Sequence, residues 1–451
     1  MNKVISAVEI LQRGFEKELL PYYIIALSYI LVVFSYPMPP SPGIVEALMG
    51  VGLVVACLLI LIELKREYLG RSKYISISLG AGSLLVIYPT IHGVVNGLGI
   101  AQISRDLLPM VFIAILVPLI SYGVKNEQRG KVGGILLASV LFVGAISPIE
   151  FIADMKDEFG SMGALSSAFD ATYSNPENIQ VPTIKEAAAP TAAAPTAATT
   201  APNTFSVRAL HMFEPAVIFA AIYCGCLLVL AAMRRQYLQM ALCATVVIIA
   251  LYGFATLRLR APVGLFAASV LIFIIYMSLH SSSAKERFAI TAVVISFCVL
   301  GGIVFKDIWW GLIEKTLLVG ANGKLEEWAA IFQLMGDRVS NLLFGIGWGA
   351  EFVPDYQTQP VRYTHSLISF VLLKSGLLGL LLLALVYGRL IFRQFAQYRN
   401  AKIEYEQLAL ILAGAAVLLI GLAFQPTYKM LGFSLAISIL LIMQAKLSRA
   451  A

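Results

Sequence analysis

The stretch RYTHSLISFVLLKSGLLG, residues 362–379, places polar side chains that can do chemistry directly before a long apolar run. We expect a helix to start near His365, where free backbone N–H groups and the positive end of the helix dipole point the same way. A histidine in that place can take a proton from a hydroxyl group as a general base. An incidental histidine capping a helix-packing groove fits this stretch equally well.

Small residues follow the histidine on the same side of the expected helix. Ser369, Gly376 and Gly379 project onto the face that carries His365. Because small side chains let a helix or a lipid chain approach closely, this face predicts a lipid groove. Lys374 lies deep in the same run, where an unpaired cation is costly. We expect it to form a structural ion pair, with a route for substrate or proton as the alternative.

Arginines stand at the outer starts of two other expected helices. Arg258 and Arg260 lie in one turn, and Arg105 precedes another apolar run. Helix amino termini combined with guanidinium groups suit a phosphate or diphosphate. For a single arginine, contact with lipid headgroups is the better interpretation, but convergence with His365 favours a diphosphate site. The segment before the histidine adds further cations: Lys324, Arg338 and Arg362.

The composition predicts an all-α polytopic membrane protein. The chain is 59% hydrophobic and 13% charged, with a mean hydropathy of +0.83. The cysteines lie inside apolar runs and are interpreted as packing residues. We count about twelve runs near the length of roughly 20 residues that a bilayer requires. They cover residues 18–37, 44–64, 75–92, 106–123, 132–149, 213–233, 236–257, 261–280, 288–305, 365–388, 406–424 and 430–445.

The loops between these runs predict the topology and the domain organisation. Lys and Arg are denser in the short loops on the side of both termini, which places both termini in the cytoplasm. In an outer segment, an Ala/Pro/Thr-rich tract predicts a disordered tether, whereas LEEWAAIFQLM predicts a short helix in an ordered outer loop. The expected regions are 1–149 (five spans), 150–212 (tether segment), 213–305 (four spans), 306–364 (ordered loop) and 365–451 (three spans).

Several motifs of metal and nucleotide chemistry are missing from the sequence. It has no Walker A loop, no acidic D-x-D pair in an outer loop, no Cys/His cluster with metal-ligand spacing and no G-x-S-x-G turn. We therefore expect an enzyme of this kind to work without a metal or other cofactor. The loop distribution of the cations is a topology signal and gives no indication of a nucleic-acid partner.

The spacing of His365, Ser366, Gly376 and Gly379 resembles the signature of the O-antigen ligase/polymerase superfamily. The family also has an arginine at the turn after its seventh span, and in this chain Arg260 or Arg258 resembles it. In the outer loop, KLEEW and LLFGIGWG look like the family's basic-x-x-x-Trp and Phe-Gly-x-Gly elements. Lys324 departs from the pattern, because an arginine is usual there.

The resemblance implies a glycosyltransferase of the bacterial inner membrane with a periplasmic active site. It would transfer a glycan from undecaprenyl diphosphate to a sugar hydroxyl, inverting the anomeric carbon without a metal. The resemblance makes His365 the catalytic base and gives the diphosphate to Arg260, Arg258, Arg105 and Arg338. Support would come from Lys324, Arg362, Tyr363 and Ser366.

Three functions remain open at this point. An O-antigen ligase of lipopolysaccharide biosynthesis, with lipid A–core as the acceptor, is favoured because His365 is followed by Ser366. A polymerase of O-antigen or exopolysaccharide is the close alternative, since Arg338 and Gly349 repeat the spacing of His365 and Gly376; its acceptor is another lipid-linked glycan. A secondary transporter or flippase comes third, since the halves of the chain show no repeat.

Overall fold

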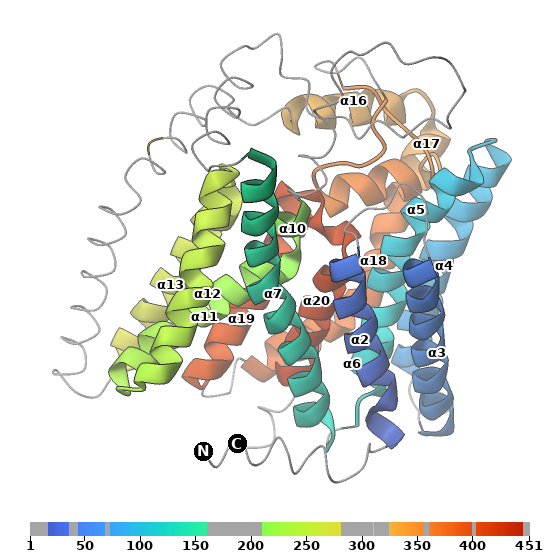
Figure 1. The fold of residues 1–451 in the computed structure, drawn as a ribbon. Coiled ribbons are helices and arrows are strands. Elements are labelled where there is room, and N and C mark those ends of the chain that lie inside the picture. The colour runs from blue at the N-terminus through green and yellow to red at the C-terminus, as the bar shows by residue number, and fades with distance from the viewer. Residues whose placement is uncertain are drawn as a thin grey trace.

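The computed structural model describes residues 17–35, 44–67, 73–125, 127–159, 210–280, 310, 324–354, 360–398 and 403–444. Two expectations from the sequence, the Ala/Pro/Thr-rich tether and the span at 288–305, lie outside these residues. Each of the other predicted apolar runs carries helix, in the order shown in Figure 1.

Long helices cross the molecule from one end to the other (Figure 1). Among the described residues, nine helices are long and apolar enough to span a membrane, and two shorter apolar helices cover Leu20–Phe34 and Leu431–Ile442. This confirms an all-α polytopic membrane protein. The main helices are α2 (Leu20–Ser35), α3 (Ile44–Glu67), α4 (Lys73–Val95), α5 (Ile100–Val111), α6 (Val117–Gly123), α7 (Arg129–Phe159), α11 (Pro215–Met233), α12 (Tyr237–Thr256), α13 (Arg260–His280), α18 (Leu367–Tyr398), α19 (Tyr405–Leu419) and α20 (Leu431–Gln444).

Short helical segments connect or cover these helices. A π-helix, η2 (Phe112–Leu116), joins α5 to α6, and a second one, η4 (Ile420–Phe424), extends α19. A short 3₁₀-helix, η5 (Pro426–Lys429), leads into α20, and α10 (Leu210–Phe213) precedes α11. The 3₁₀-helix η1 (Lys17–Leu19) opens the described chain.

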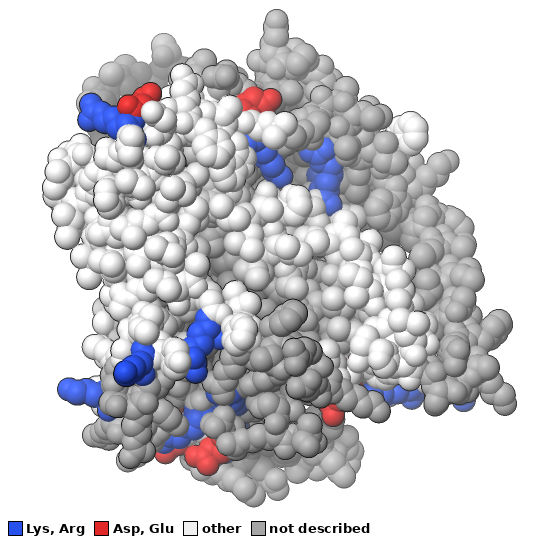
Figure 2. Space-filling model, turned by 180° about the vertical axis from the view of Figure 1, so that it is seen from behind, with Lys and Arg blue, Asp and Glu red and all other residues white. Residues whose placement is uncertain are grey.

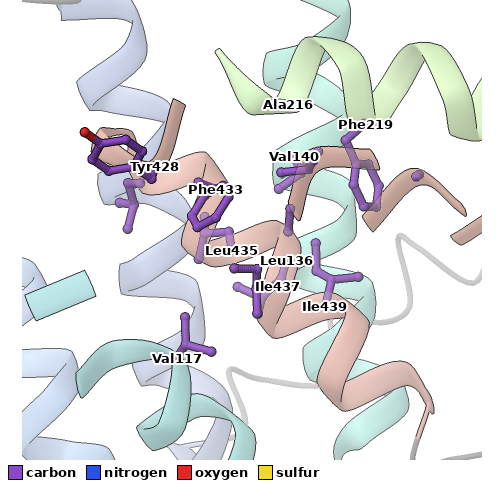
Figure 3. Close-up of a cluster of buried hydrophobic side chains, with 14 of the residues drawn as sticks. Val117, Leu136, Val140, Ala216, Phe219, Tyr428, Phe433, Leu435, Ile437 and Ile439 are labelled. Atoms are coloured by element: carbon purple, nitrogen blue, oxygen red, sulfur yellow. The ribbon is translucent and has the colours of Figure 1, made fainter. Parts of the chain in front are cut away.

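The core of the bundle forms around α11 and α20. Helix α11 packs against α7, α12, α13 and α19, while α20 packs against α6, α7 and α19. Figure 3 shows Leu435 and Ile439 of α20 among Val117 of α6, Leu136 of α7 and Phe219 of α11, and all five are fully buried. Helix α11 is apolar on all sides, as expected of a helix surrounded by other helices.

The outer surface of the bundle is apolar between its two ends. Figure 2 shows a face on which Lys, Arg, Asp and Glu gather at the top and bottom and leave a wide uncharged belt. Large apolar side chains such as Leu48, Val51, Leu238 and Leu279 are exposed. An exposed apolar belt on helices of this length fits the hydrocarbon core of a bilayer.

Two shorter helices cover one end of the bundle (Figure 1). They are α16 (Lys324–Gly336) and α17 (Val339–Phe344). The first confirms the short helix predicted from LEEWAAIFQLM. Its buried residues Ile331 and Met335 join Phe352 and Leu373 in a small second hydrophobic cluster, which attaches α16 to α18.

The chain after α17 enters the bundle, whereas the sequence predicted that this segment stays in a loop outside it. The indole N–H of Trp348 donates to the Val86 carbonyl at 3.1 Å, and its backbone N–H donates to the Pro89 carbonyl at 3.1 Å. Trp348 is fully buried. Both acceptor carbonyls belong to α4, so the inserted chain packs directly on the backbone of that helix.

Helix α18 is broken at Gly376, which has φ 62° and ψ −164°. The inserted loop satisfies the carbonyls that this break frees, because Ile346 N–H donates to Leu373 O at 3.0 Å and Gly347 N–H to Lys374 O at 2.9 Å. A Cβ on Gly376 would lie 2.5 Å from the carbonyl oxygen of Leu343. The glycine face therefore offers no open groove at Gly376: the protein's own loop occupies it.

Candidate active site

His365 is held by a buried carboxylate. Its ring Nδ1 lies 2.5 Å from Oε2 of Glu327, and its backbone N–H donates to Oε1 at 2.9 Å. The Glu327 side chain is 3% exposed and the His365 side chain 34% exposed. A carboxylate on Nδ1 fixes the orientation of the ring and leaves Nε2 to accept a proton. This is the arrangement of a general base with an orienting partner.

Glu327 reaches His365 because of its place on α16. It precedes the buried residues Ile331 and Met335 at intervals of four along the helix, so the three share the face that packs onto the bundle. A carboxylate on a buried face is costly unless it is hydrogen-bonded. Its two contacts with His365 supply that compensation.

The start of α18 fixes the backbone beside the histidine. Ser366 is the N-cap, because its Oγ accepts from the N–H of Ser369 at 3.0 Å and its carbonyl accepts from the N–H of Phe370 at 3.0 Å. Ser369 is fully buried, and its Oγ lies 2.7 Å from that of Ser366. Both serines thus stabilise the helix start. Further along the same helix, Gly379 has no room for a side chain, because an added Cβ would lie 2.2 Å from the Ser375 Cβ.

The two residues before His365 are each tied to a different part of the chain. The Tyr363 hydroxyl donates to the backbone carbonyl of Arg105 at 3.1 Å. The carbonyl of Thr364 accepts from the hydroxyl of Tyr428 at 3.0 Å, and both residues are buried. These bonds link the histidine segment to α5 and η5, so the base stands on a fixed backbone.

Lys374 has a partner, Asp106 of α5. Its Nζ lies 2.7 Å from Oδ2 of Asp106, and both side chains are fully buried. The same Oδ2 accepts from the N–H of Gly349 at 2.7 Å, and the ammonium group also donates to the Ala350 carbonyl. Arg362 Nε lies 3.6 Å from the other carboxylate oxygen. The expected structural ion pair is present, and it joins α5, α18, the inserted loop and the histidine segment.

Cations gather on the α16 side of the histidine. Lys324 lies one turn before Glu327 on α16, and its Nζ stands 5.0 Å from the ring centroid of Phe424. Burial, together with the nearby positive charge of Arg260, lowers the pKa of Lys324 from its usual value. Arg260 begins α13, and the turn before it contains Arg258 in a left-handed conformation, with φ 49°. The positive charges of Lys324 and Arg260 are thus close enough to interact, and Lys324 also interacts with Glu327 of the dyad.

The structure places the other predicted cations differently. Arg362 and Arg105 lie on the α5 side: Arg362 approaches Asp106 of α5, and the backbone carbonyl of Arg105 accepts from the Tyr363 hydroxyl. Arg338 is the N-cap residue of α17 and its side chain is exposed. Among the described residues, the Arg338 side chain makes no hydrogen bond or ion pair with His365 or Glu327.

The sequence interpretation did not assign roles to Glu327 and Asp106. A signal existed for each. Glu327 stands in register with the apolar stripe of α16, where a charged residue is unexpected. Asp106 is an acid in one apolar run and Lys374 a base in another, and charges buried in membrane helices pair with one another. In the part of the chain that the structure describes, no three or more His, Cys, Asp and Glu side chains are grouped so that they could hold a metal ion.

Fold and site together define a polytopic helical membrane protein with a histidine–carboxylate dyad and neighbouring cations at one end of its bundle. Comparisons of the chain with protein-family models, with curated proteins and with solved structures found no match.

Proposed function

We propose that the chain is an inner-membrane glycosyltransferase of the O-antigen ligase type. It transfers a glycan from undecaprenyl diphosphate to a sugar hydroxyl on lipid A–core. The observation that carries this proposal is the dyad of His365 and Glu327, held at the end of an apolar bundle beside Lys324 and Arg260. A base next to cations at a membrane face suits a reaction between a hydroxyl and a lipid diphosphate.

In the proposed reaction, His365 accepts the proton of the acceptor hydroxyl. The hydroxyl oxygen forms a bond to the anomeric carbon as the bond from that carbon to the diphosphate oxygen breaks, and the configuration inverts. Undecaprenyl diphosphate leaves with the bonding electron pair. Arg260 and Lys324, with Arg258 in the adjacent turn, stabilise the negative charge that grows on the leaving oxygen. Glu327 orients the base and stabilises its protonated form.

The proposed orientation places the dyad in the periplasm and both termini in the cytoplasm. Helix α18 begins beside α16 and runs to the opposite end, where α3 ends, α7 begins and α11 ends. Those helix ends carry Lys65, Arg129 and Arg234. Cations in short loops at that end favour the cytoplasmic side.

A polymerase of O-antigen or exopolysaccharide is the second candidate. The chemistry at His365 is the same, and the acceptor is another lipid-linked glycan. Arg338 and Gly349 support it by spacing, and the structure gives Gly349 a defined place, with φ 91° and its N–H on Asp106.

A secondary transporter or flippase is the third candidate. The break in α18 and the buried Asp106–Lys374 pair are features that transporters use. Here the inserted loop already hydrogen-bonds the freed carbonyls of Leu373 and Lys374, and the pair bonds to the loop. These groups are therefore engaged with the protein itself, which favours the glycosyltransferase.

A transfer assay tests the proposal. Purified protein in nanodiscs receives an undecaprenyl-diphosphate-linked glycan in the presence of EDTA, with lipid A–core or a second lipid-linked glycan as the acceptor. The variants are His365→Ala and, as a matched control, His280→Ala at the far end of α13. A product on lipid A–core that is lost in His365→Ala and kept in His280→Ala supports the ligase. A ladder from the lipid-linked glycan alone supports the polymerase, and no histidine-dependent product with either acceptor contradicts both.

A further inference from the structure

A second group of cations surrounds Tyr363, two residues before the proposed base. Lys429 Nζ lies 3.7 Å from the centroid of the Tyr363 ring, and Arg362 Cζ lies 5.1 Å from it. Cations stack on aromatic faces in this way, with modest stabilisation. Lys429 is partly exposed at the end of η5.

The carboxylates near this group are already engaged. Asp106 binds Lys374 at 2.7 Å and lies 3.6 Å from Arg362. Glu351 accepts from the side chain of Gln102 at 3.1 Å. Within the described part of the chain, no carboxylate lies within ion-pair distance of Lys429.

The surroundings of Lys429 do not favour its positive charge. Burial, together with the nearby charge of Arg362, lowers the pKa of Lys429 to about 7, and the negative charge of Asp106 opposes this only in part. An anion bound here would compensate the excess positive charge, because charge–charge interactions strengthen where water is excluded. Because Asp106 already pairs with Lys374, an anion bound beside Tyr363 would interact favourably with both Lys429 and Arg362.

The cations around Tyr363 are separate from those near Lys324. η4, which contains Phe424 under Lys324, packs against α13, the helix that begins at Arg260. The following segment, η5, contains Lys429 and packs against α5. The chain from η4 to η5 therefore connects two groups of cations. His365 contacts Glu327 of α16, near the first group, and Tyr363 of the second group stands two residues before His365 in the chain.

We propose that Lys429, with Arg362 and Tyr363, forms a second anion subsite that binds a phosphate or carboxylate substituent of the acceptor glycan. This inference rests on the proposed function. The donor diphosphate takes the cations at Arg260 and Lys324, and the acceptor hydroxyl must lie at His365. An anionic group on a neighbouring part of the acceptor then falls beside Tyr363. The preferred acceptor is therefore an anionic glycolipid rather than a neutral one.

The test uses the full chain in nanodiscs of neutral phosphatidylcholine and two acceptors, lipid A–core with its phosphates and the same glycolipid after phosphatase treatment. Equilibrium binding of each acceptor is measured without donor, and transfer is measured in parallel. The variants are Lys429→Gln, the conservative Lys429→Arg, and Lys65→Gln at the opposite end of the bundle as a matched control. Equal thermal stability of the variants establishes that each is folded.

The subsite predicts that wild type binds the phosphorylated acceptor about tenfold more tightly than the phosphatase-treated one, a difference typical of one charge-assisted contact. Lys429→Gln should abolish this preference, while Lys429→Arg and Lys65→Gln keep it, and the KM for the donor should not change. An unchanged preference in Lys429→Gln, equal weakening for both acceptors, or no preference in wild type would overturn the inference. The inference would also be overturned if Lys429→Gln changed the preference only in nanodiscs that contain anionic phosphatidylglycerol, because the group bound at Lys429 would then be a lipid headgroup.

The two assays separate the inference from the proposed function. Histidine-dependent transfer without a phosphate preference overturns the subsite and leaves the glycosyltransferase intact. A Lys429-dependent binding preference without transfer overturns the ligase and keeps an anionic-glycolipid site at Lys429.

Discussion

Glu327 contacts His365 at two points, its carboxylate accepting the backbone N–H at 2.9 Å and approaching the ring Nδ1 to 2.5 Å. The first contact fixes the backbone at the start of α18, and the second fixes the ring. Glu327 belongs to α16, a helix that covers one end of the bundle, so this helix completes the site. The placement of the proposed base therefore depends on the docking of α16.

This relationship predicts unequal effects for two adjacent glutamates. Glu327→Gln should lower kcat by up to about 100-fold with little change in KM, because an amide stabilises the protonated imidazole less well. Glu326→Gln is the control, since Glu326 is exposed on the same turn; its kcat should stay at the wild-type level. Steady-state transfer rates of both variants measure the effect. An equal loss of kcat in the two variants would show that the contact between Glu327 and the His365 ring does not contribute to catalysis.

The different surroundings of Arg260 and Arg338 predict different effects on donor binding. Arg260→Gln should raise the KM for the lipid-linked donor by about tenfold, because a charged contact to the diphosphate is lost. Arg338→Gln should change it by less than about twofold, since an exposed charge contributes little. Donor titrations of the two variants measure the difference. A larger effect at Arg338 would move the diphosphate site toward α17.

The pair of Asp106 and Lys374 predicts a strongly non-additive double-mutant cycle. Lys374→Met alone should destabilise the protein by about 3–5 kcal/mol, because it leaves a buried carboxylate without its partner. Asp106→Leu combined with Lys374→Met should cost less than the sum of the two single changes. Unfolding titrations in detergent measure these free energies. Additive single effects would show that the two side chains do not interact in solution.

The break in α18 predicts opposite outcomes for two glycines of that helix. Gly376→Ala should destabilise the protein by about 1–3 kcal/mol or more, because a side chain at positive φ is strained and its Cβ would clash with Leu343 and Gly345. Gly388→Ala meets nothing within 4 Å and should be neutral or stabilising by up to about 1 kcal/mol. Thermal unfolding compares the two, and a neutral Gly376→Ala would indicate a continuous helix.

Much of the fold could be predicted from the sequence because apolar run length is a local property. Each predicted run inside the described residues carries helix, and α16 lies where the amphipathic spacing placed it. The break at Gly376 was not predicted, because the projection of Ser369, Gly376 and Gly379 onto one face assumes a continuous helix. The freed carbonyls are satisfied by a distant loop, and periodicity cannot indicate that.

The site could be predicted only in part. His365 and Arg260 were singled out from their positions at helix starts, and Lys324 from its place in the outer segment and in the KLEEW element. Their partners were not, since Glu327 is 38 residues from His365 and Asp106 lies on another helix from Lys374. Pairs of this kind depend on tertiary packing. Charged residues within apolar patterns were the available signal, and both Glu327 and Asp106 carry it.

Chemical rescue of His365→Gly by imidazole tests the central claim most directly. The variant should lose about 100- to 10,000-fold in single-turnover transfer, the usual contribution of a general base, and added imidazole should restore part of that rate by occupying the space beside Glu327. His280→Gly should be unaffected with or without imidazole. A His365→Gly variant that transfers glycan at the wild-type rate would contradict the account.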